Sequence, residues 1–390
     1  MSMRRIIIAG AGLAGHRAAI ALRENGFDGH LTVLGDELHH PYDRPPLSKQ
    51  LLGGEYSTEQ CFFPVGDLDV DWRLGTSAVG LDPRLRTVAL SDGTSLDYDG
   101  LVIATGRRAR EWNLSRGLSG VHTLRSLEDA LGFRAAVTPS SRVVIVGAGF
   151  IGCEVAATLR KQGVENVTLV NVAPYPMPVL GPEAGARAAA LHESNGVTLR
   201  MNCGVEALEG VDRVEAVRLT GGERIAADQV LVAVGSMPNS EWLAGSGLLL
   251  AEGAVVCDEY CFATGAEDIV VVGDVAAWPH PHADTGASVE HWTNARDMAA
   301  TAAANLLASV EERKPLSSVP ACWSDQYDVK IKTAGFLRAA NRYVVVEDDP
   351  ERPALVVEAY RDEELVGAIV FNRNRSIINY QRRLATVPVA

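Results

Sequence analysis

Residues 5–15 read Arg-Ile-Ile-Ile-Ala-Gly-Ala-Gly-Leu-Ala-Gly, and residues 143–152 read Val-Val-Ile-Val-Gly-Ala-Gly-Phe-Ile-Gly. Each stretch is a short apolar run that predicts a buried strand, followed by glycines in G-x-G-x-x-G spacing and then by a helical pattern. The first glycine permits a tight turn, the second lets the backbone approach a pyrophosphate, and the third lets the helix pack closely on the strand. Two such units in one chain can hold a flavin and a nicotinamide together, which indicates hydride transfer.

The composition limits the remaining possibilities. A length of 390 residues suggests two or three domains, and 47% hydrophobic residues allow large cores. The net charge of −13 argues against general nucleic-acid binding. No apolar run approaches the ~20 residues of a membrane span, so we expect no membrane association. The six cysteines show no paired framework, which fits a reducing, cytoplasmic setting.

The order of strand and helix patterns predicts an α/β protein with two Rossmann-like dinucleotide-binding domains and a small C-terminal α+β domain. The first unit ends in the apolar strand 98–106, and the second ends in the similar stretch 230–239. A strand ending in Gly273-Asp274 and a helix over about 293–308 follow, and the β-type runs come last. We expect the first domain to comprise residues 1–110 and 237–316, the second 111–236, and the third 317–390, with 110–120 as a linker.

Charge is distributed unevenly between these parts. Residues 323–390 contain ten Lys/Arg and ten Asp/Glu, so the remainder of the chain carries the whole negative charge. A chance feature of a solvated surface and a less acidic face that docks an acidic protein both explain this, and the pattern alone does not choose between them.

The chain resembles the FAD-containing ferredoxin reductases related to putidaredoxin and rubredoxin reductases, a branch of the two-dinucleotide flavoproteins with the glutathione-reductase-like fold. The resemblance covers nearly the whole chain and depends on several segments together. These segments are Pro41-Tyr42-Asp43-Arg44-Pro45-Pro46-Leu47-Ser48-Lys49, Leu124-Arg125-Ser126-Leu127-Glu128-Asp129-Ala130, Gly273-Asp274, Glu290-His291-Trp292-Thr293-Asn294-Ala295 and Trp323-Ser324-Asp325-Gln326-Tyr327.

The resemblance implies that the first glycine loop binds the ADP half of FAD. Asp36 lies 21 residues after Gly15, where an acid can accept hydrogen bonds from the adenosine ribose, and its neighbour Glu37 is the alternative. Arg44, Lys49 and Arg125 match cations near the flavin, and Asp274 matches the acid that contacts the ribityl chain. Apart from the residues of the second loop, the residues expected to bind a cofactor are Gly10, Gly12, Ala14, Gly15, Asp36, Arg44, Lys49, Val79, Thr105, Gly106, Arg125, Gly235, Gly273, Asp274, Glu290, His291 and Trp292.

The second loop matches the nicotinamide dinucleotide site. Its expected residues are Gly147, Gly149, Ile151, Gly152, Glu154 and Asn171. The resemblance implies that Glu154 orients the nicotinamide carboxamide and pairs with Lys49, which makes these two the expected catalytic residues. Asn171 stands 19 residues after Gly152, where relatives that use NADH usually carry an acid. Since Val172 to Tyr175 supply no cation for a 2′-phosphate, we expect NADH to be preferred and NADPH to be discriminated against only weakly.

The cysteines indicate where the electrons go. Disulfide-reductase relatives carry a redox-active cysteine pair soon after the first unit, whereas residues 42–49 contain no cysteine. The reduced flavin must therefore pass its electrons to an external acceptor. Cys257 and Cys261 have C-x₃-C spacing, but two ligands alone do not make a metal site, so no metal is expected.

The sequence thus predicts a ferredoxin–NAD(P)⁺ reductase with FAD as cofactor, in which electrons pass from NADH to a [2Fe–2S] ferredoxin that serves a cytochrome P450 or a Rieske-type oxygenase. Trp323, Lys330 and Lys332 are expected to dock that acceptor, and a core role for Trp323 is the alternative. Other open readings are a rubredoxin reductase, an NADH oxidase or peroxidase (disfavoured by the missing cysteine), and a dinucleotide-binding redox sensor without steady turnover. A monomer and a homodimer are both compatible with the sequence.

Overall fold

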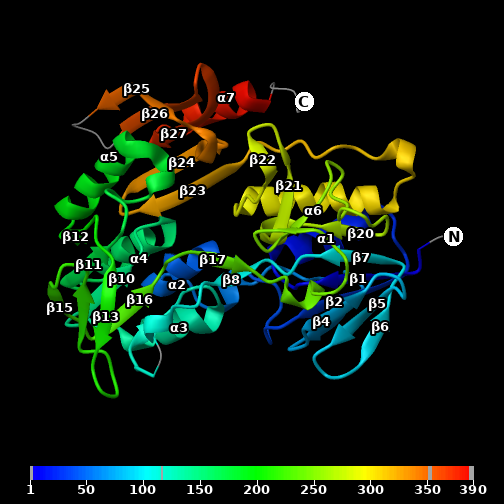
Figure 1. The fold of residues 1–390 in the computed structure, drawn as a ribbon, viewed down its shortest axis with the longest axis horizontal. Coiled ribbons are helices and arrows are strands. Elements are labelled where there is room, and N and C mark those ends of the chain that lie inside the picture. Colours follow the sequence, from blue (N-terminus) through cyan, green and yellow to red (C-terminus); the bar gives the residue numbers. More distant parts are fainter. Residues whose placement is uncertain (1–2, 116, 350–353, 386–390) are drawn as a thin grey trace.

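The computed structural model describes residues 3–115, 117–349 and 354–385. Within these residues, seven α-helices and 27 strands are arranged in three parts, with the N-terminal unit and the second unit side by side and the C-terminal part packed above them (Figure 1). Because the two glycine loops belong to different units, the space between these units is where two dinucleotides can meet.

The first unit is built on a five-stranded parallel sheet with the order β20-β7-β1-β2-β3. The apolar run of the first glycine motif forms the central strand, and helices α1 and α6 pack against each other beside the sheet. The bounds are β1 (Arg5–Ala9), α1 (Leu13–Glu24), β2 (His30–Gly35), α2 (Gln50–Gly53), β3 (Asp71–Leu74), β7 (Gly100–Ile103), β20 (Ile269–Val271) and α6 (Trp292–Leu307).

Two smaller sheets complete this unit. One is antiparallel, with β4 (Ala78–Asp82), β5 (Thr87–Leu90) and β6 (Ser95–Asp97). The other has the order β18-β19-β21-β22 and comprises β18 (Leu250–Ala251), β19 (Ala254–Val256), β21 (Ala276–His280) and β22 (Ala283–Ala287). The chain thus returns to the first unit after the second, as the sequence predicts.

The second unit repeats the design with the parallel order β12-β11-β10-β16-β9. Its bounds are β9 (Val121–His122), α3 (Leu127–Ala136), β10 (Arg142–Val146), α4 (Phe150–Lys161), β11 (Asn166–Val170), α5 (Gly181–Ser194), β12 (Thr198–Arg200), β13 (Val205–Glu209), β14 (Ala216–Leu219), β15 (Arg224–Ala226) and β16 (Gln229–Val232). Strands β13 to β15 form a separate antiparallel sheet.

The chain passes between the units through two antiparallel strands, β8 (Arg107–Ala109) and β17 (Ser236–Pro238). These strands lie beside the expected domain boundaries at residues 110 and 236, and the boundaries themselves stay predictions. The crossing brings the ends of both parallel sheets to one region of the molecule.

The C-terminal part is a five-stranded antiparallel sheet with the order β23-β24-β27-β26-β25, covered by one helix. Its bounds are β23 (Ala321–Gln326), β24 (Val329–Gly335), β25 (Arg342–Asp349), β26 (Ala354–Arg361), β27 (Glu364–Phe371) and α7 (Asn374–Ala385). The β-type runs expected in this part are confirmed by β25, β26 and β27. The α+β prediction implies a helix here, which is α7, but its position was not predicted because its polar sequence buries only Ile377 and Tyr380. Residues of β24, β26 and β27 share one core cluster with the second unit. The sheet therefore holds β23 firmly against α4.

Candidate active site

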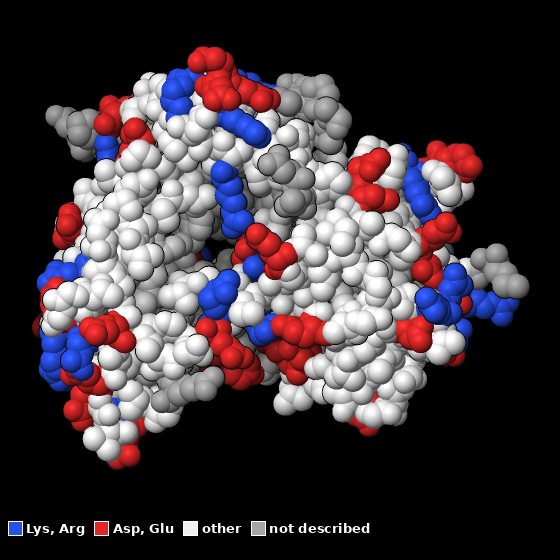
Figure 2. All heavy atoms as spheres, viewed as in Figure 1, with Lys and Arg blue, Asp and Glu red and all other residues white. Residues whose placement is uncertain are grey.

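One large cavity lies where the three parts meet, and it has a volume of about 1410 Å³. Single-ligand pockets usually measure roughly 300–1,000 Å³, so this cavity is large enough for more than one ligand. Figure 2 shows the molecule hollowed near its centre, with charged side chains of both signs around the opening. The expected site residues that line it are Gly10, Gly12, Ala14, Asp36, Arg44, Lys49, Thr105, Gly106, Arg125, Gly149, Ile151, Glu154, Gly235, Asp274, Glu290, His291, Trp292 and Trp323.

The first glycine loop is shaped by close backbone contacts and leaves room at its middle. Gly10 has a φ of +120°, and a Cβ there would lie 2.2 Å from the Ala104 carbonyl oxygen. A Cβ on Gly15 would lie 1.9 Å from the Gly10 carbonyl oxygen, whereas a Cβ on Gly12 would meet nothing within 4 Å. Protein packing therefore requires glycine at two positions, and the free space at Gly12 suits a ligand approaching the backbone.

Helix α1 begins at this loop with unoccupied amide groups. Its N-cap, Gly12, provides no side-chain cap, and the first turn holds no acidic residue. The second loop and α4 repeat this arrangement, because the N-cap residue, Gly149, has no side chain that could cap the helix and the first turn again lacks an acid. Unpaired amides and the positive end of the helix dipole fit a pyrophosphate at each loop.

Asp36 and Glu37 follow β2 and have separate roles in the structure. The Glu37 carboxylate is occupied, since Arg44 Nη2 donates to it at 2.6 Å and Tyr42 Oη at 2.5 Å. Asp36 is exposed on the cavity, and only the backbone N–H of Glu37 donates to it among the described residues. Asp36 is thus the acid that is available to a ribose, and Glu37 orients Arg44.

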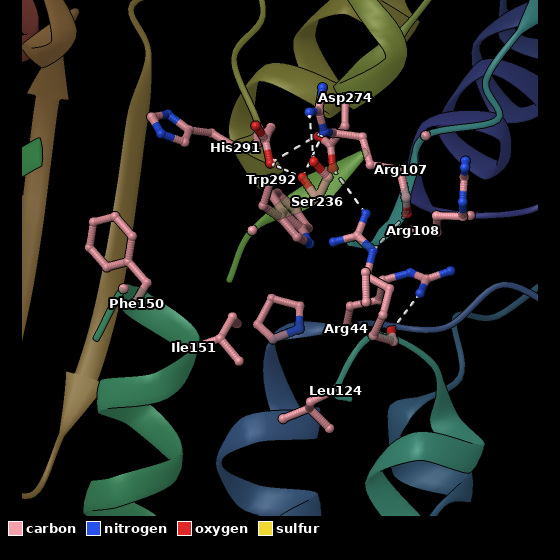
Figure 3. A pocket seen from close by; sticks show the side chains of 18 of the residues that line it. Arg44, Arg107, Arg108, Leu124, Phe150, Ile151, Ser236, Asp274, His291 and Trp292 are labelled. Carbon is pink, nitrogen blue, oxygen red and sulfur yellow. Dashed lines mark hydrogen bonds and ion pairs between the residues drawn. The ribbon is translucent and has the colours of Figure 1, made fainter. Parts of the chain in front are cut away.

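A second group of charges lies deeper in the cavity. Arg125 Nη2 pairs with Asp274 Oδ2 at 3.1 Å, and Arg125 Nε donates to the Arg107 carbonyl oxygen at 2.9 Å. Asp129 closes a capping box at the start of α3 and also accepts from the Arg125 backbone N–H, so the loop is fixed. Figure 3 shows Arg44, Arg107 and Asp274 on one side of the cavity, with Phe150 and Ile151 of α4 on the other.

Lys49 and Glu154 form a buried ion pair that joins the two units. Lys49 Nζ lies 2.6 Å from Glu154 Oε2, and the two side chains are 10% and 4% exposed. Ser48 Oγ donates to the same oxygen at 2.5 Å, and Ser324 Oγ donates to Oε1 at 2.8 Å. The expected pair is therefore present in the geometry, and two serines that the sequence analysis did not single out complete it.

Residues 290–292 form the edge of the cavity beneath the C-terminal part. Glu290 accepts from Ser236 Oγ at 2.6 Å and pairs with Arg107 at 3.5 Å and Arg338 at 3.8 Å. Burial lowers the pKa of His291 to about 4, so its ring is neutral at pH 7. These contacts join β8, β17 and the C-terminal part at one point of the cavity rim.

Trp292 and Trp323 face each other in an edge-on pair with ring centroids 6.1 Å apart. Trp292 Nε1 donates to Asp43 Oδ1 at 2.8 Å, and burial raises the pKa of Asp43. Both indoles line the cavity and are partly exposed, so neither is only core filler.

Several expected residues lie away from the cavity. Gly15, Gly147, Gly152 and Gly273 do not line it; the first three shape the two glycine loops, and Gly273 begins the short turn that carries Asp274. Val79 is 53% exposed on β4, at a register shift between Ala78 and Gly80, and it does not line the cavity. The geometry therefore argues against the role expected for Val79.

Three further expected residues lie outside the cavity lining. Asn171 follows β11, and its Nδ2 donates to the Tyr175 carbonyl oxygen at 3.4 Å. Lys330 and Lys332 lie on β24, opposite Asp325 and Trp323 of β23. Lys330 is exposed and Lys332 is half-buried. They can reach a protein partner beside Trp323, but they do not line the cavity.

Sequence reasoning missed Arg107, Arg108 and Ser236, which come from the two crossing strands. Arg108 lines the cavity and pairs with Glu241 at 2.6 Å. The available signal was the pair of arginines directly after Thr105-Gly106. Their role depends on pairing between strands more than 120 residues apart in the chain, which a single-sequence pattern does not reveal.

The cysteines remain free and mostly buried. Burial raises the pKa of the Cys322 thiol to about 11, although Cys322 lines the cavity, and it raises the pKa of Cys261 to about 12. In the described part of the chain, no group of three or more potential ligands could hold a metal ion. Thiol chemistry at the cavity is thus disfavoured, in agreement with the absence of cysteine from residues 42–49.

Among the helices of the described ranges, none has the length and apolar character needed to cross a membrane.

Comparison with known proteins gives matches over almost the whole chain. Residues 4–299 match the pyridine nucleotide-disulphide oxidoreductase family, and residues 321–387 match the reductase C-terminal family. The ferredoxin reductase component of the chlorobenzene dioxygenase of Cupriavidus sp. (strain PS12) is 37% identical over 345 residues, which is 87% of this chain and 82% of that protein. Rhodocoxin reductase of Rhodococcus erythropolis is 35% identical over 388 residues, with 98% of this chain and 89% of that protein covered.

A solved structure agrees. The covalent putidaredoxin reductase–putidaredoxin complex superimposes with a TM-score of 0.92 at 30% sequence identity, and the match covers 99% of this chain and 94% of the other. The expected fold, two dinucleotide-binding units and a small C-terminal domain, is confirmed.

Proposed function

The chain belongs to the pyridine nucleotide-disulphide oxidoreductase family and carries the reductase C-terminal domain, and from that membership we propose that it is an FAD-dependent ferredoxin reductase. It oxidises NADH and passes the electrons one at a time to a [2Fe–2S] ferredoxin that supplies a cytochrome P450 or a Rieske-type oxygenase. One NADH thus reduces two ferredoxins and yields NAD⁺ and one proton.

One observation supports this proposal: two glycine loops with matching close backbone contacts open towards one cavity, and burial raises the pKa of Cys322, the cysteine that lines it. The paired loops support the binding of two dinucleotides. The lack of a reactive thiol among the described cavity residues supports an external electron acceptor. The similarity to ferredoxin reductase components of oxygenase systems supports the class of that acceptor.

The residues present fit FAD at the first loop. The open space at Gly12, the uncapped start of α1 and the available carboxylate of Asp36 suit its pyrophosphate and ribose, and Arg44, Arg125 and Asp274 suit its flavin half. When bound, FAD supplies the chemistry that accepts a hydride and releases single electrons. We propose the same expected set for this role, apart from Val79.

The protein contributes binding and orientation around that chemistry. Gly149 and the start of α4 hold the pyrophosphate of NADH, Glu154 accepts a hydrogen bond from its carboxamide, and the ion pair with Lys49 holds the Glu154 side chain in place. The neutral ring of His291 and the indole of Trp292 wall the cavity and restrict water. No general base is required, because a hydride carries its own electron pair.

We propose that the acceptor docks where Trp323 reaches the cavity, with Lys330 and Lys332 on the neighbouring strand. The even charge balance of residues 323–390 favours contact with an acidic protein relative to the acidic remainder of the chain. We further propose domain limits at residues 110, 236 and 316, a cytoplasmic location, and NADH as the preferred donor in view of Asn171.

The test is NADH-dependent reduction of cytochrome c by the purified protein, with and without added [2Fe–2S] ferredoxin. Strong stimulation by ferredoxin is expected, together with bleaching of the visible flavin absorbance by NADH. Stimulation by rubredoxin but not by ferredoxin would identify rubredoxin as the class of acceptor. Bleaching without steady turnover with either carrier would favour a redox sensor, and no bleaching would contradict the proposal.

A further inference from the structure

A chain of four polar side chains lies behind Glu154, on the side away from Lys49. Ser324 Oγ is 2.8 Å from Glu154 Oε1, Gln326 Nε2 is 3.0 Å from Ser324 Oγ, and Gln326 Oε1 is 3.1 Å from His192 Nε2. His192 Nδ1 is in turn 3.1 Å from Tyr327 Oη. We refer to Ser324, Gln326, His192 and Tyr327 as the Ser324 chain.

The deep burial of these hydrogen-bonded side chains is uncommon for polar groups. Ser324, Gln326 and His192 are all 0% exposed, and Tyr327 is half-buried at the outer end. Buried polar groups are retained at a cost unless each one finds a partner. Here Ser324, Gln326 and His192 each have a partner on both sides, so the Ser324 chain forms a continuous hydrogen-bonded connection from Tyr327 to Glu154.

The direction of every hydrogen bond follows from the charge of Glu154. Because the carboxylate paired with Lys49 can only accept, Ser324 Oγ donates its hydrogen bond to Glu154 and accepts one from Gln326 Nε2. The Gln326 carbonyl oxygen then faces His192, so Nε2 of His192 carries the proton and Nδ1 accepts from Tyr327. All four donors point towards Glu154.

The same chemistry shows that the chain positions a group and does not conduct protons. A primary amide such as that of Gln326 does not readily accept a proton on its oxygen and release another from its nitrogen. Burial also lowers the pKa of His192 to about 4, so the ring stays neutral at pH 7. A neutral, one-directional chain orients its terminal acceptor.

The occupancy of the carboxylate defines what is oriented. Oε2 of Glu154 accepts hydrogen bonds from Lys49 and Ser48, and Oε1 accepts one from Ser324. Since each carboxylate oxygen has two lone pairs, one remains on Oε1 for a ligand in the cavity. The terminal torsion of a glutamate is otherwise broad, so the Ser324 hydroxyl selects the rotation that presents this lone pair.

We propose that Ser324 is a positioning residue for the nicotinamide, acting through Glu154, so that the C-terminal domain takes part in NADH recognition. The inference rests on the proposed function, in which Glu154 receives the nicotinamide carboxamide. It deepens that function because Ser324 directly follows Trp323 on β23. The strand that presents Trp323 at the cavity thus also fixes the acid of the donor site.

Calorimetric titration of the oxidised, flavin-loaded protein with NAD⁺ and with ADP-ribose tests this inference without turnover. The two ligands share the adenosine and the pyrophosphate, so the ratio of their dissociation constants reports the nicotinamide contact. In Ser324→Ala we expect the dissociation constant of NAD⁺ to rise about five- to tenfold relative to that of ADP-ribose, which stays unchanged. Ser324→Thr keeps the hydroxyl and should restore the ratio, and Asp325→Asn, on the opposite face of β23, should behave as wild type.

A double-mutant cycle with Glu154→Gln separates action through Glu154 from a direct effect. If Ser324 acts through Glu154, adding Ser324→Ala to Glu154→Gln changes the ratio little further. Additive losses, an unchanged ratio in Ser324→Ala, or equal weakening of both ligands would overturn the inference. A wild-type protein that binds ADP-ribose as tightly as NAD⁺ would instead contradict the nicotinamide contact in the proposed function.

Discussion

Gly10 and Gly147 turn their loops with φ of +120° and +105°, and a Cβ on either would lie 2.2 Å from a carbonyl oxygen, that of Ala104 or Ala233. The third glycines agree as closely, since a Cβ on Gly15 or Gly152 would lie 1.9 or 2.0 Å from the first glycine's carbonyl oxygen. The two units thus share one backbone design, which by itself indicates only that each binds a dinucleotide.

The side chains around the two loops differ. Five positions after the middle glycine, α1 carries Arg17 and α4 carries Glu154. After the second strand, the first unit presents Asp36 and the second presents Asn171. The comparison teaches that the glycine loop fixes where a pyrophosphate lies, whereas charges one turn or one strand away decide which dinucleotide is held.

Lys49→Met tests the difference between the two helices most strongly. Removing the cation leaves the Glu154 carboxylate buried without a counter-charge, and we expect unfolding by urea to become easier by about 3–5 kcal/mol. The matched change, Arg17→Met, removes a half-buried cation that faces the rings of Phe63 and Trp292, and should cost about 1 kcal/mol or less. Equal losses of stability in the two variants would contradict the difference inferred between the charges on α1 and α4.

Alanine at the first glycines tests the shared backbone. Gly10→Ala and Gly147→Ala each force a Cβ into a backbone carbonyl at positive φ, and each should cost roughly 3 kcal/mol. Gly12→Ala and Gly149→Ala meet no atom within 4 Å and should change stability by less than about 1 kcal/mol in protein freed of dinucleotide. Thermal unfolding of the four variants provides the measurement, and a clear difference between Gly10→Ala and Gly147→Ala would show that the loops are not equivalent.

The second unit should also show a pH dependence through His192. In the unfolded chain this histidine takes up a proton as the pH falls below its ordinary value of 6.5, whereas the folded protein resists protonation down to about 4. Stability is therefore lost as the pH falls, by about 2 kcal/mol between pH 7 and pH 5 for this group. His192→Asn should be less stable at pH 7 but should lose less on acidification. An unchanged pH slope would show that His192 takes up its proton in the fold at the same pH as in the unfolded chain.

Asn171→Asp makes the second unit resemble the first at the strand end. A carboxylate accepts from a ribose 2′-hydroxyl and repels a 2′-phosphate, so the ratio of kcat/KM for NADH over NADPH should rise about tenfold, which corresponds to roughly 1.4 kcal/mol. Steady-state kinetics with both donors checks this expectation. A wild-type preference for NADPH would contradict the assignment of Asn171.

Local sequence patterns were sufficient for the parallel sheets and the loops. Apolar runs ending in glycine predicted β1 and β10, and the helix expected over 293–308 is observed as α6 (Trp292–Leu307). The position of helix α7 in the predicted α+β domain was not given by the sequence, because polar and charged residues dominate the helix and its packing on the sheet supplies the stabilisation.

The site was predictable where family segments named its residues and less so where distant strands meet. Lys49 and Glu154 were expected to pair and lie 2.6 Å apart. The contributions of Ser236 and Ser324 depend on tertiary contacts across β17 and β23, which carry no local signature. Val79 was expected at the site but lies exposed at a register shift of β4, a feature that depends on the pairing with β5 and has no local signature.

The most direct test of the account is the flavin content of Gly12→Val and Gly149→Val, read from the visible absorbance of the purified proteins. The account predicts that Gly12→Val is folded but colourless. Gly149→Val should keep a full complement of flavin and lose its bleaching by NADH. Loss of flavin from Gly149→Val with retention in Gly12→Val would contradict the assignment of the two loops, and equal flavin loss in both would contradict their separate roles.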